Sequence, residues 1–235
     1  MWPTVLPSAS IVVPVAAMLV AVVASATLGF FVPRIAPPEA SDEQDEPAPN
    51  YASLATRGAV VGIGAFTFAV ALTLWVVPVA FWPLWVPYLA FGAPLVYVDL
   101  RTTYLPKRLS GVMQGAMLVG LILTALLSPS GAVAAVLGGA AFAGLFWLIW
   151  RFSRSFGFGD VRLAAPVGAV AAASDANPLL VVQGWVLALF VGTLLGAVAG
   201  VVWSAIRRRR GGPSYFPYGP WLWLGPIIAL PLSGW

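Results

Sequence analysis

The sequence predicts an all-α fold, a polytopic transmembrane bundle of about eight helices. Hydrophobic residues make up 60% of the 235 residues and charged residues only 9%, whereas a soluble domain has about 45–50% apolar and about 25% charged residues. Apolar stretches of roughly 20 residues recur along the chain, and that is the length of helix that crosses a bilayer. The basic residues are confined to every second connection between these stretches, as in a membrane protein with a fixed orientation.

Eight apolar stretches form the predicted helices, with boundaries good to about three residues. They span residues 9–32, 58–78, 81–98, 109–127, 132–150, 161–174, 179–204 and 221–234. No lysine or arginine precedes the first stretch, so residues 1–32 are expected to be a retained membrane anchor and not a cleaved signal peptide. The stretch 161–174 is short for a span, because as a helix it extends about 21 Å against a hydrocarbon core of about 30 Å.

The basic residues also predict the orientation of the bundle. Threading the chain through eight crossings places all 12 lysines and arginines on one side of the membrane, and the positive-inside rule makes that side cytoplasmic. These residues are Arg34, Arg57, Arg101, Lys107, Arg108, Arg151, Arg154, Arg162 and Arg207 to Arg210. Topology therefore accounts for the net charge of +4, and no nucleic-acid partner is expected.

Residues 33–57 are the only long polar interruption in the chain. We expect a flexible cytoplasmic linker here, because the segment is rich in acidic residues and proline and poor in apolar ones; residues 58–235 then form the membrane-embedded bundle. The acidic residues of the linker are Glu39, Asp42, Glu43, Asp45 and Glu46. In a second interpretation these acids attract a basic segment of a substrate.

Two residue types are missing altogether. The chain contains no histidine and no cysteine, which excludes Ser-His and Cys-His nucleophiles and metal sites built from imidazole or thiolate. Any catalyst must therefore use carboxylates, lysine, tyrosine or hydroxyl groups. No metal and no cofactor are expected.

Outside the linker the chain has three acidic residues, Asp99, Asp160 and Asp175. Asp175 lies in the sequence SDANP, which is typical of a turn. Asp99 directly follows an apolar stretch and Asp160 directly precedes one, so both are expected where a helix meets the cytoplasmic boundary. Ionisable residues at such depths are functional candidates; the alternative is a salt bridge, to Arg101 or Arg162 for example.

A pair of neighbouring carboxylates has a specific chemistry. Two such groups cannot both ionise cheaply, so the pair holds one proton, with one member as base and the other as acid. The base takes a proton from water as the water attacks a peptide carbonyl, and the acid protonates the developing oxyanion. This reaction requires neither histidine nor metal.

Three motifs occur in order along the chain: Asp99 with the following Leu105-Pro106, then GFGDVRL from Gly157, then FPYGPWLWLG from Phe216. Together they resemble the type IV prepilin peptidase family, membrane aspartyl proteases of the G-x-G-D kind, over roughly residues 84–230. The resemblance implies that Asp99 and Asp160 are the catalytic pair, which cleaves the short basic leader of a prepilin or pseudopilin. It also implies a bacterial inner membrane location with the catalytic face in the cytoplasm.

By the same resemblance, other residues bind substrate or shape the site: Gly157, Gly159, Arg162, Pro106, Lys107, Pro217 and Gly219. For Pro217 and Gly219 a packing role is the preferred interpretation. Lys107 stands where the family often has Asp or Asn, and Arg162 stands where it commonly has Lys, which keeps the charge but not its geometry. Bifunctional members often carry C-x-x-C pairs in the linker and also methylate; without cysteine here, we expect peptidase activity alone.

Two other functions remain open at the level of sequence. Another intramembrane G-x-G-D protease, of the presenilin kind, would share the second motif, although such proteases usually have Tyr-Asp at the first acid and lack F-P-Y-G-P. A membrane transporter or assembly protein would use Asp99 and Asp160 as proton or cation sites. Transporters often contain inverted repeats, and none is visible in this sequence.

Overall fold

The computed structural model describes residues 9–36, 49–153, 157–174, 178–210 and 216–232. Within these ranges the chain forms eight α-helices and no strand, which confirms the predicted all-α bundle. The acidic residues of the linker and Asp175 lie outside the described ranges.

The helices begin and end where local chemistry dictates. They are α1 (Ala9–Ala26), α2 (Arg57–Ala71), α3 (Trp82–Thr102), α4 (Lys107–Leu127), α5 (Pro129–Phe152), α6 (Phe158–Ala172), α7 (Pro178–Arg210) and α8 (Gly219–Ala229). A π turn (Thr27–Phe31) and 3₁₀ turns (Val32–Arg34, Tyr51–Leu54, Leu72–Trp75, Val79–Phe81 and Leu230–Leu232) extend or precede some of them. The hydroxyls of Thr56 and Ser128 cap α2 and α5 by accepting N–H bonds from Ala59 and Gly131, at 3.2 and 3.1 Å.

Six segments of the described chain are long and apolar enough to cross a membrane. They are Ile11–Arg34, Arg57–Trp75, Val79–Thr102, Lys107–Leu127, Pro129–Phe152 and Val181–Ile206. Helices α6 and α8 contain only 15 and 11 residues, fewer than the roughly 20 that a crossing needs. Both short helices begin before the predicted apolar stretches at 161 and 221 but end at Ala172 and Ala229. The eight predicted helices are therefore six long spans and two short helices.

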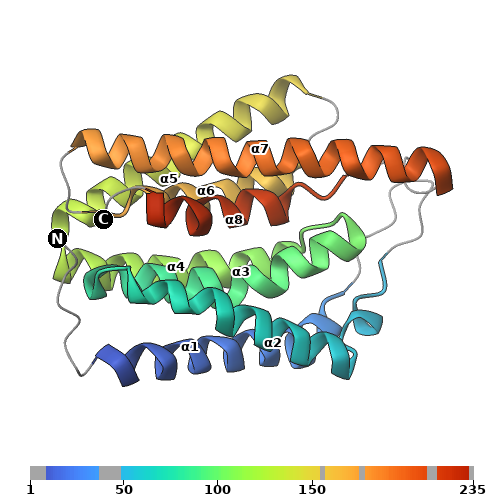
Figure 1. Ribbon diagram of the computed structural model, residues 1–235, viewed down its shortest axis with the longest axis horizontal. Helices are drawn as coiled ribbons and strands as arrows, with labels where there is room; N and C mark the ends of the chain where they lie inside the picture. The colour runs from blue at the N-terminus through green and yellow to red at the C-terminus, as the bar shows by residue number, and fades with distance from the viewer. Residues whose placement is uncertain (1–8, 37–48, 154–156, 175–177, 211–215, 233–235) are drawn as a thin grey trace.

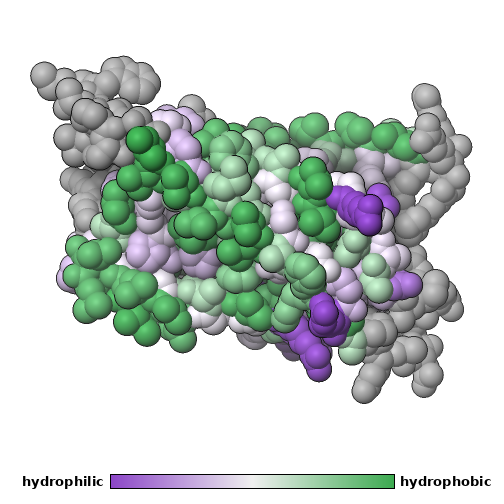
Figure 2. Space-filling model, turned by 90° about the horizontal axis from the view of Figure 1, so that it is seen from below, coloured by the Kyte–Doolittle hydropathy of each residue, from purple (hydrophilic) through white to green (hydrophobic). Residues whose placement is uncertain are grey.

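The eight helices run alternately up and down the bundle (Figure 1). Helices α1 and α2 lie along its lower side, α3 and α4 run through the middle, and α5 to α8 form the upper part. Helices α1, α3, α5 and α7 end at the right-hand end of the view, where α2, α4, α6 and α8 begin. Figure 2 shows strongly hydrophilic residues toward that same end, so the connections there are the ones that carry the positive charge.

Small residues let the upper helices approach closely. A Cβ added at Gly138 of α5 would lie 2.6 Å from the carbonyl oxygen of Gly168 of α6, so these two backbones are in contact. On α7, Cβ atoms at Gly192, Gly196 and Gly200 would meet Trp221, Tyr218 and Phe216 respectively, at 3.3, 2.6 and 3.7 Å. The glycine face of α7 thus packs along α8 and the segment that leads into it.

A reciprocal hydrogen-bond pair joins α3 to α8. The hydroxyl of Tyr88 donates to the carbonyl oxygen of Trp223 at 2.5 Å, and the indole N–H of Trp223 donates to the carbonyl oxygen of Tyr88 at 3.3 Å. Both side chains are fully buried, and their rings stack with centroids 5.8 Å apart. Because buried polar groups must be paired, this arrangement fixes how α8 lies against α3.

The described ends of the predicted linker are packed on the bundle. Ile35 at one end and Tyr51 and Leu54 at the other are buried. The hydroxyl of Tyr97 on α3 is 3.5 Å from the carbonyl oxygen of Leu54. The linker therefore returns to α3 near the C-terminal end of that helix before α2 begins.

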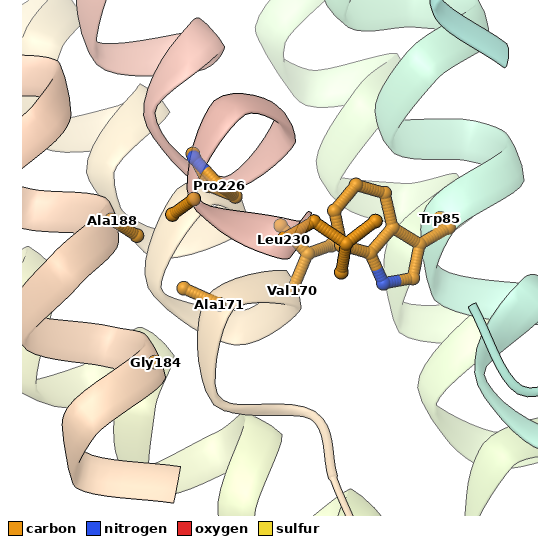
Figure 3. Close-up of a pocket in the computed structure, with 8 residues that line it drawn as sticks. Trp85, Val170, Ala171, Gly184, Ala188, Pro226 and Leu230 are labelled. Atoms are coloured by element: carbon orange, nitrogen blue, oxygen red, sulfur yellow. The ribbon is translucent and has the colours of Figure 1, made fainter. Parts of the chain in front are cut away.

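A cavity of about 10 Å³ lies between the beginnings of α3 and α7 and the ends of α6 and α8 (Figure 3). Trp85 and Val170 line it from one side and Ala188 from the other. The cavity has room for about one water molecule. It lies at the end of the bundle remote from Asp99 and Asp160, so it is not the predicted site.

Replacing Gly120 by alanine is expected to destabilise the fold. The new Cβ would lie 2.0 Å from the carbonyl oxygen of Pro83, a backbone atom that can move only if α3 and α4 separate. Overpacking of this kind costs about 1–3 kcal/mol in the free energy of unfolding. Gly115 is a matched control on the same helix, because nothing lies within 4 Å of its Cβ position. Thermal unfolding in detergent measures both variants, and equal midpoints would contradict the close approach of the two helices.

Candidate active site

Asp99 lies in the last turn of α3 and is almost fully buried, with 4% of its surface exposed. Its carboxylate oxygen Oδ2 accepts a hydrogen bond from the backbone N–H of Gly219, the first residue of α8, at 3.1 Å. The position of the N–H at the beginning of a helix adds a favourable interaction with negative charge. The hydrogen-bond donor for the Asp99 carboxylate thus comes from a residue 120 positions later in the chain.

Asp160 is the third residue of α6 and is partly buried. Its carboxylate accepts a hydrogen bond from the backbone N–H of Gly157, which precedes the helix. An acidic side chain that bonds back to the N-terminal N–H groups stabilises the start of a helix. Both aspartates are therefore held in the same way, by the backbone N–H of a glycine at the beginning of a short helix.

The fold brings the two aspartates together. The charge of Asp99 acts on the carboxylate of Asp160, although the two residues come from different helices. Among the described groups that act on either carboxylate there is no cation, and Arg101 is exposed while Asp99 is buried. The salt-bridge interpretation with Arg101 or Arg162 thus has no support here. Two carboxylates within electrostatic range of each other, with no described cation acting on them, favour the singly protonated pair.

The segment between Asp99 and α4 covers the glycine loop before Asp160. Thr103 follows α3 in the left-handed conformation, at φ 57° and ψ 21°, and this turns the chain back toward α6. Leu105 then lies against Gly159, where an added Cβ would be 2.8 Å from the Cβ of Leu105. Pro106 is buried and precedes the first residue of α4. The Leu-Pro and Gly-x-Gly motifs are therefore two sides of one contact.

Tyr218 is a site residue that the sequence argument quoted in a motif but did not assign. It caps α8, directly before Gly219, and its ring packs over Gly196 and lies 6.2 Å from the ring of Phe146. Burial, and to a smaller extent the negative charge of Asp160, raise the pKa of Tyr218 to about 12. Near neutral pH the phenol is therefore protonated and stands within electrostatic range of the pair. The signal in the sequence that could have identified Tyr218 is its position inside the F-P-Y-G-P motif.

Lys107, Arg162 and Pro217 are the remaining predicted residues. Lys107 is exposed at the first position of α4. The guanidinium of Arg162 lies over the ring of Phe158, 4.9 Å from its centroid, and two residues along a helix place it about 200° around α6 from Asp160. Pro217 is buried just before Tyr218, as its predicted packing role requires.

The described side chains at this site offer few ligands for a metal ion. In the ranges that the structure describes, no three carboxylates gather at one place. The pair of aspartates is suited instead to acid–base chemistry.

Comparison with known proteins addresses the family directly. Residues 86–201 match the type IV leader peptidase family. No curated protein matches the chain, and no solved structure does.

The matched range contains Asp99, the Leu-Pro pair and the whole GFGDVRL motif. It stops before Phe216–Gly225. The membrane-spanning helices and this match together identify a membrane-embedded peptidase. The family resemblance is thereby confirmed over residues 86–201, which are similar to the type IV leader peptidase family.

Proposed function

We propose that this protein is a prepilin peptidase in which Asp99 and Asp160 activate water to cleave the basic leader of a type IV prepilin-like protein. The observation that carries the proposal is that these two carboxylates lie within electrostatic range of each other, each held by a glycine N–H at the beginning of a helix. The family match over residues 86–201 supports the peptidase class. The aspartic mechanism and the prepilin substrate go beyond this match and are part of the proposal.

The proposed reaction begins with one proton on the pair. The ionised carboxylate takes a proton from water as the water oxygen attacks the scissile carbonyl carbon. The protonated carboxyl group gives its proton to the carbonyl oxygen, which forms a tetrahedral diol. The carboxyl group that took the water proton then donates it to the leaving amine nitrogen, while the other carboxylate takes a proton from one hydroxyl of the diol. The C–N bond breaks, and the pair again holds one proton.

The surrounding groups restrict the geometry of this pair. The N–H of Gly219 occupies Oδ2 of Asp99, which leaves Oδ1 of that carboxylate to face the water. The Tyr218 phenol remains protonated near neutral pH, since burial raises its pKa to about 12. It is thus a neutral donor beside the reacting carboxylates. Preorganised donors of this kind stabilise developing negative charge without reorganisation during the reaction.

The position of the pair suits a substrate with an apolar helix and a basic leader. Asp99 ends a long apolar span, Val79–Thr102, and both short helices begin beside it. The cleaved bond of such a substrate lies where its helix leaves the membrane. We propose that this end of the bundle faces the cytoplasm, because the positively charged connections lie there. A bacterial inner membrane is the corresponding location.

A transporter that uses the two aspartates as proton sites is the weaker candidate. A transport site lies near the middle of the membrane between repeats, whereas Asp99 and Asp160 are both at one end of the bundle. The peptidase family match adds to this difference. The family match also disfavours the presenilin-like alternative.

Asp99→Asn and Asp160→Asn are each expected to lower kcat by about 10²–10⁴-fold, because an amide cannot exchange the shared proton. The assay is cleavage of a prepilin-type peptide with a basic leader and an apolar helix in detergent, with the masses of both products measured. Asp175→Asn is the matched control, since it removes the third acid outside the linker, and it should cleave normally. Absence of cleavage by the unmodified protein, or full activity of either variant, would refute the mechanism.

Gly219→Ala is expected to lower kcat by at least about tenfold. The added Cβ would lie 2.7 Å from Oδ2 of Asp99 and 3.3 Å from its Cγ, so the carboxylate must move, and small displacements of reacting groups are costly. Gly111→Ala is the control on α4, where nothing lies within 4 Å. Steady-state kinetics on the same peptide compares the two; equal kcat values would show that the N–H of Gly219 does not orient Asp99.

A further inference from the structure

Pro166 creates an unpaired carbonyl in the first turn of α6. Proline has no backbone N–H, so the carbonyl oxygen four residues earlier loses its partner in the helix. For Pro166 this is the carbonyl oxygen of Arg162, two residues after Asp160. An unpaired carbonyl in an apolar bundle is costly. The turn that carries the second aspartate therefore needs a donor from elsewhere.

Gln114 of α4 supplies that donor. Its side-chain nitrogen Nε2 donates to the carbonyl oxygen of Arg162 at 3.1 Å. The side chain is exposed on the surface of the bundle, so packing does not explain its presence there. It is also the only amide side chain in α4, whose remaining residues beyond the first turn are mostly apolar. A polar side chain on a membrane helix is expected to bond to a neighbouring helix.

The bond reaches α6 from the side away from the catalytic pair. Arg162 lies about 200° around the helix from Asp160, so Gln114 supports the turn from behind and does not approach the reacting atoms. The same face of the turn is contacted by Leu105 at Gly159, three residues before Arg162. Helix α4 and the segment that follows Asp99 thus both contact the beginning of α6.

We infer that Gln114 is a positioning residue: by pairing with the carbonyl group that Pro166 leaves unpaired, it fixes the first turn of α6 and thereby the direction of the Asp160 carboxylate. This inference rests on the proposed peptidase function. The expected consequence is a change in kcat and not in KM, because the reacting group is misaligned while the substrate contacts remain.

A double-variant cycle tests the inference. Gln114→Leu removes the donor and is expected to lower kcat about tenfold with unchanged KM. Pro166→Ala provides a backbone N–H that bonds to the carbonyl group of Arg162 within the helix, and this variant should remain within about twofold of the unmodified protein. In the double variant the carbonyl group is paired again, so kcat should return to within about twofold of Pro166→Ala. A double variant as slow as Gln114→Leu would overturn the inference.

Leu118→Ala is the matched control for the surface of α4. Leu118 and Gln114 both line an apolar groove of about 270 Å³ between α4, α5 and α6. If the groove itself determined activity, for example by binding the substrate helix, Leu118→Ala would lower activity as Gln114→Leu does. Positioning by the hydrogen bond predicts normal kinetics for Leu118→Ala, so an equal loss in the two variants would count against it.

Hydrogen–deuterium exchange separates this inference from the proposed function. Gln114→Leu should speed amide exchange in peptides that cover the first turn of α6, and Pro166→Ala in the same chain should restore protection. This measurement needs no substrate. Unchanged exchange in Gln114→Leu would overturn the inference even if cleavage by the unmodified protein and its loss in Asp160→Asn support the peptidase. Absence of cleavage with the expected exchange pattern would instead refute the peptidase alone.

Discussion

Burial of Asp99, beside the partly buried Asp160, at one end of an apolar bundle is the constraint on which the remaining structure depends. Asp99 has only 4% of its surface exposed, and a buried carboxylate must be given hydrogen-bond donors. The donor is the N–H of Gly219, so α8 must begin at the end of α3. Residue 219 must then be glycine, because a Cβ would occupy the space of the carboxylate.

The two short helices follow from the same requirement. Helices α6 and α8 both begin beside the aspartates, where their first N–H groups are free to bond to side chains. A full membrane span in either place would carry these N–H groups out to the surface. The glycine faces of α5 and α7 let α6 and α8 pack closely against them.

Much of this architecture could be predicted from composition and motifs. The all-α class follows because apolar stretches in a membrane must satisfy their own backbone. The aspartates could be identified because acidic residues are rare outside the linker. The length of α8 could not be predicted as well, because the apolar run that begins at Trp221 continues beyond Ala229 as a 3₁₀ turn, Leu230–Leu232. The packed ends of the linker were also missed, since Tyr51 and Leu54 have no periodic pattern around them.

The sequence by itself determined that the chain is a membrane bundle, which end carries the positive charge, and which two aspartates are candidates for catalysis. These properties follow from the transfer free energy of side chains, which depends on residue type. Only the tertiary structure decided that the N–H of Gly219 bonds to Asp99 and that Gln114 bonds to the carbonyl group of Arg162. Such bonds depend on the packing of distant segments, and neither residue spacing nor composition determines which backbone groups then meet.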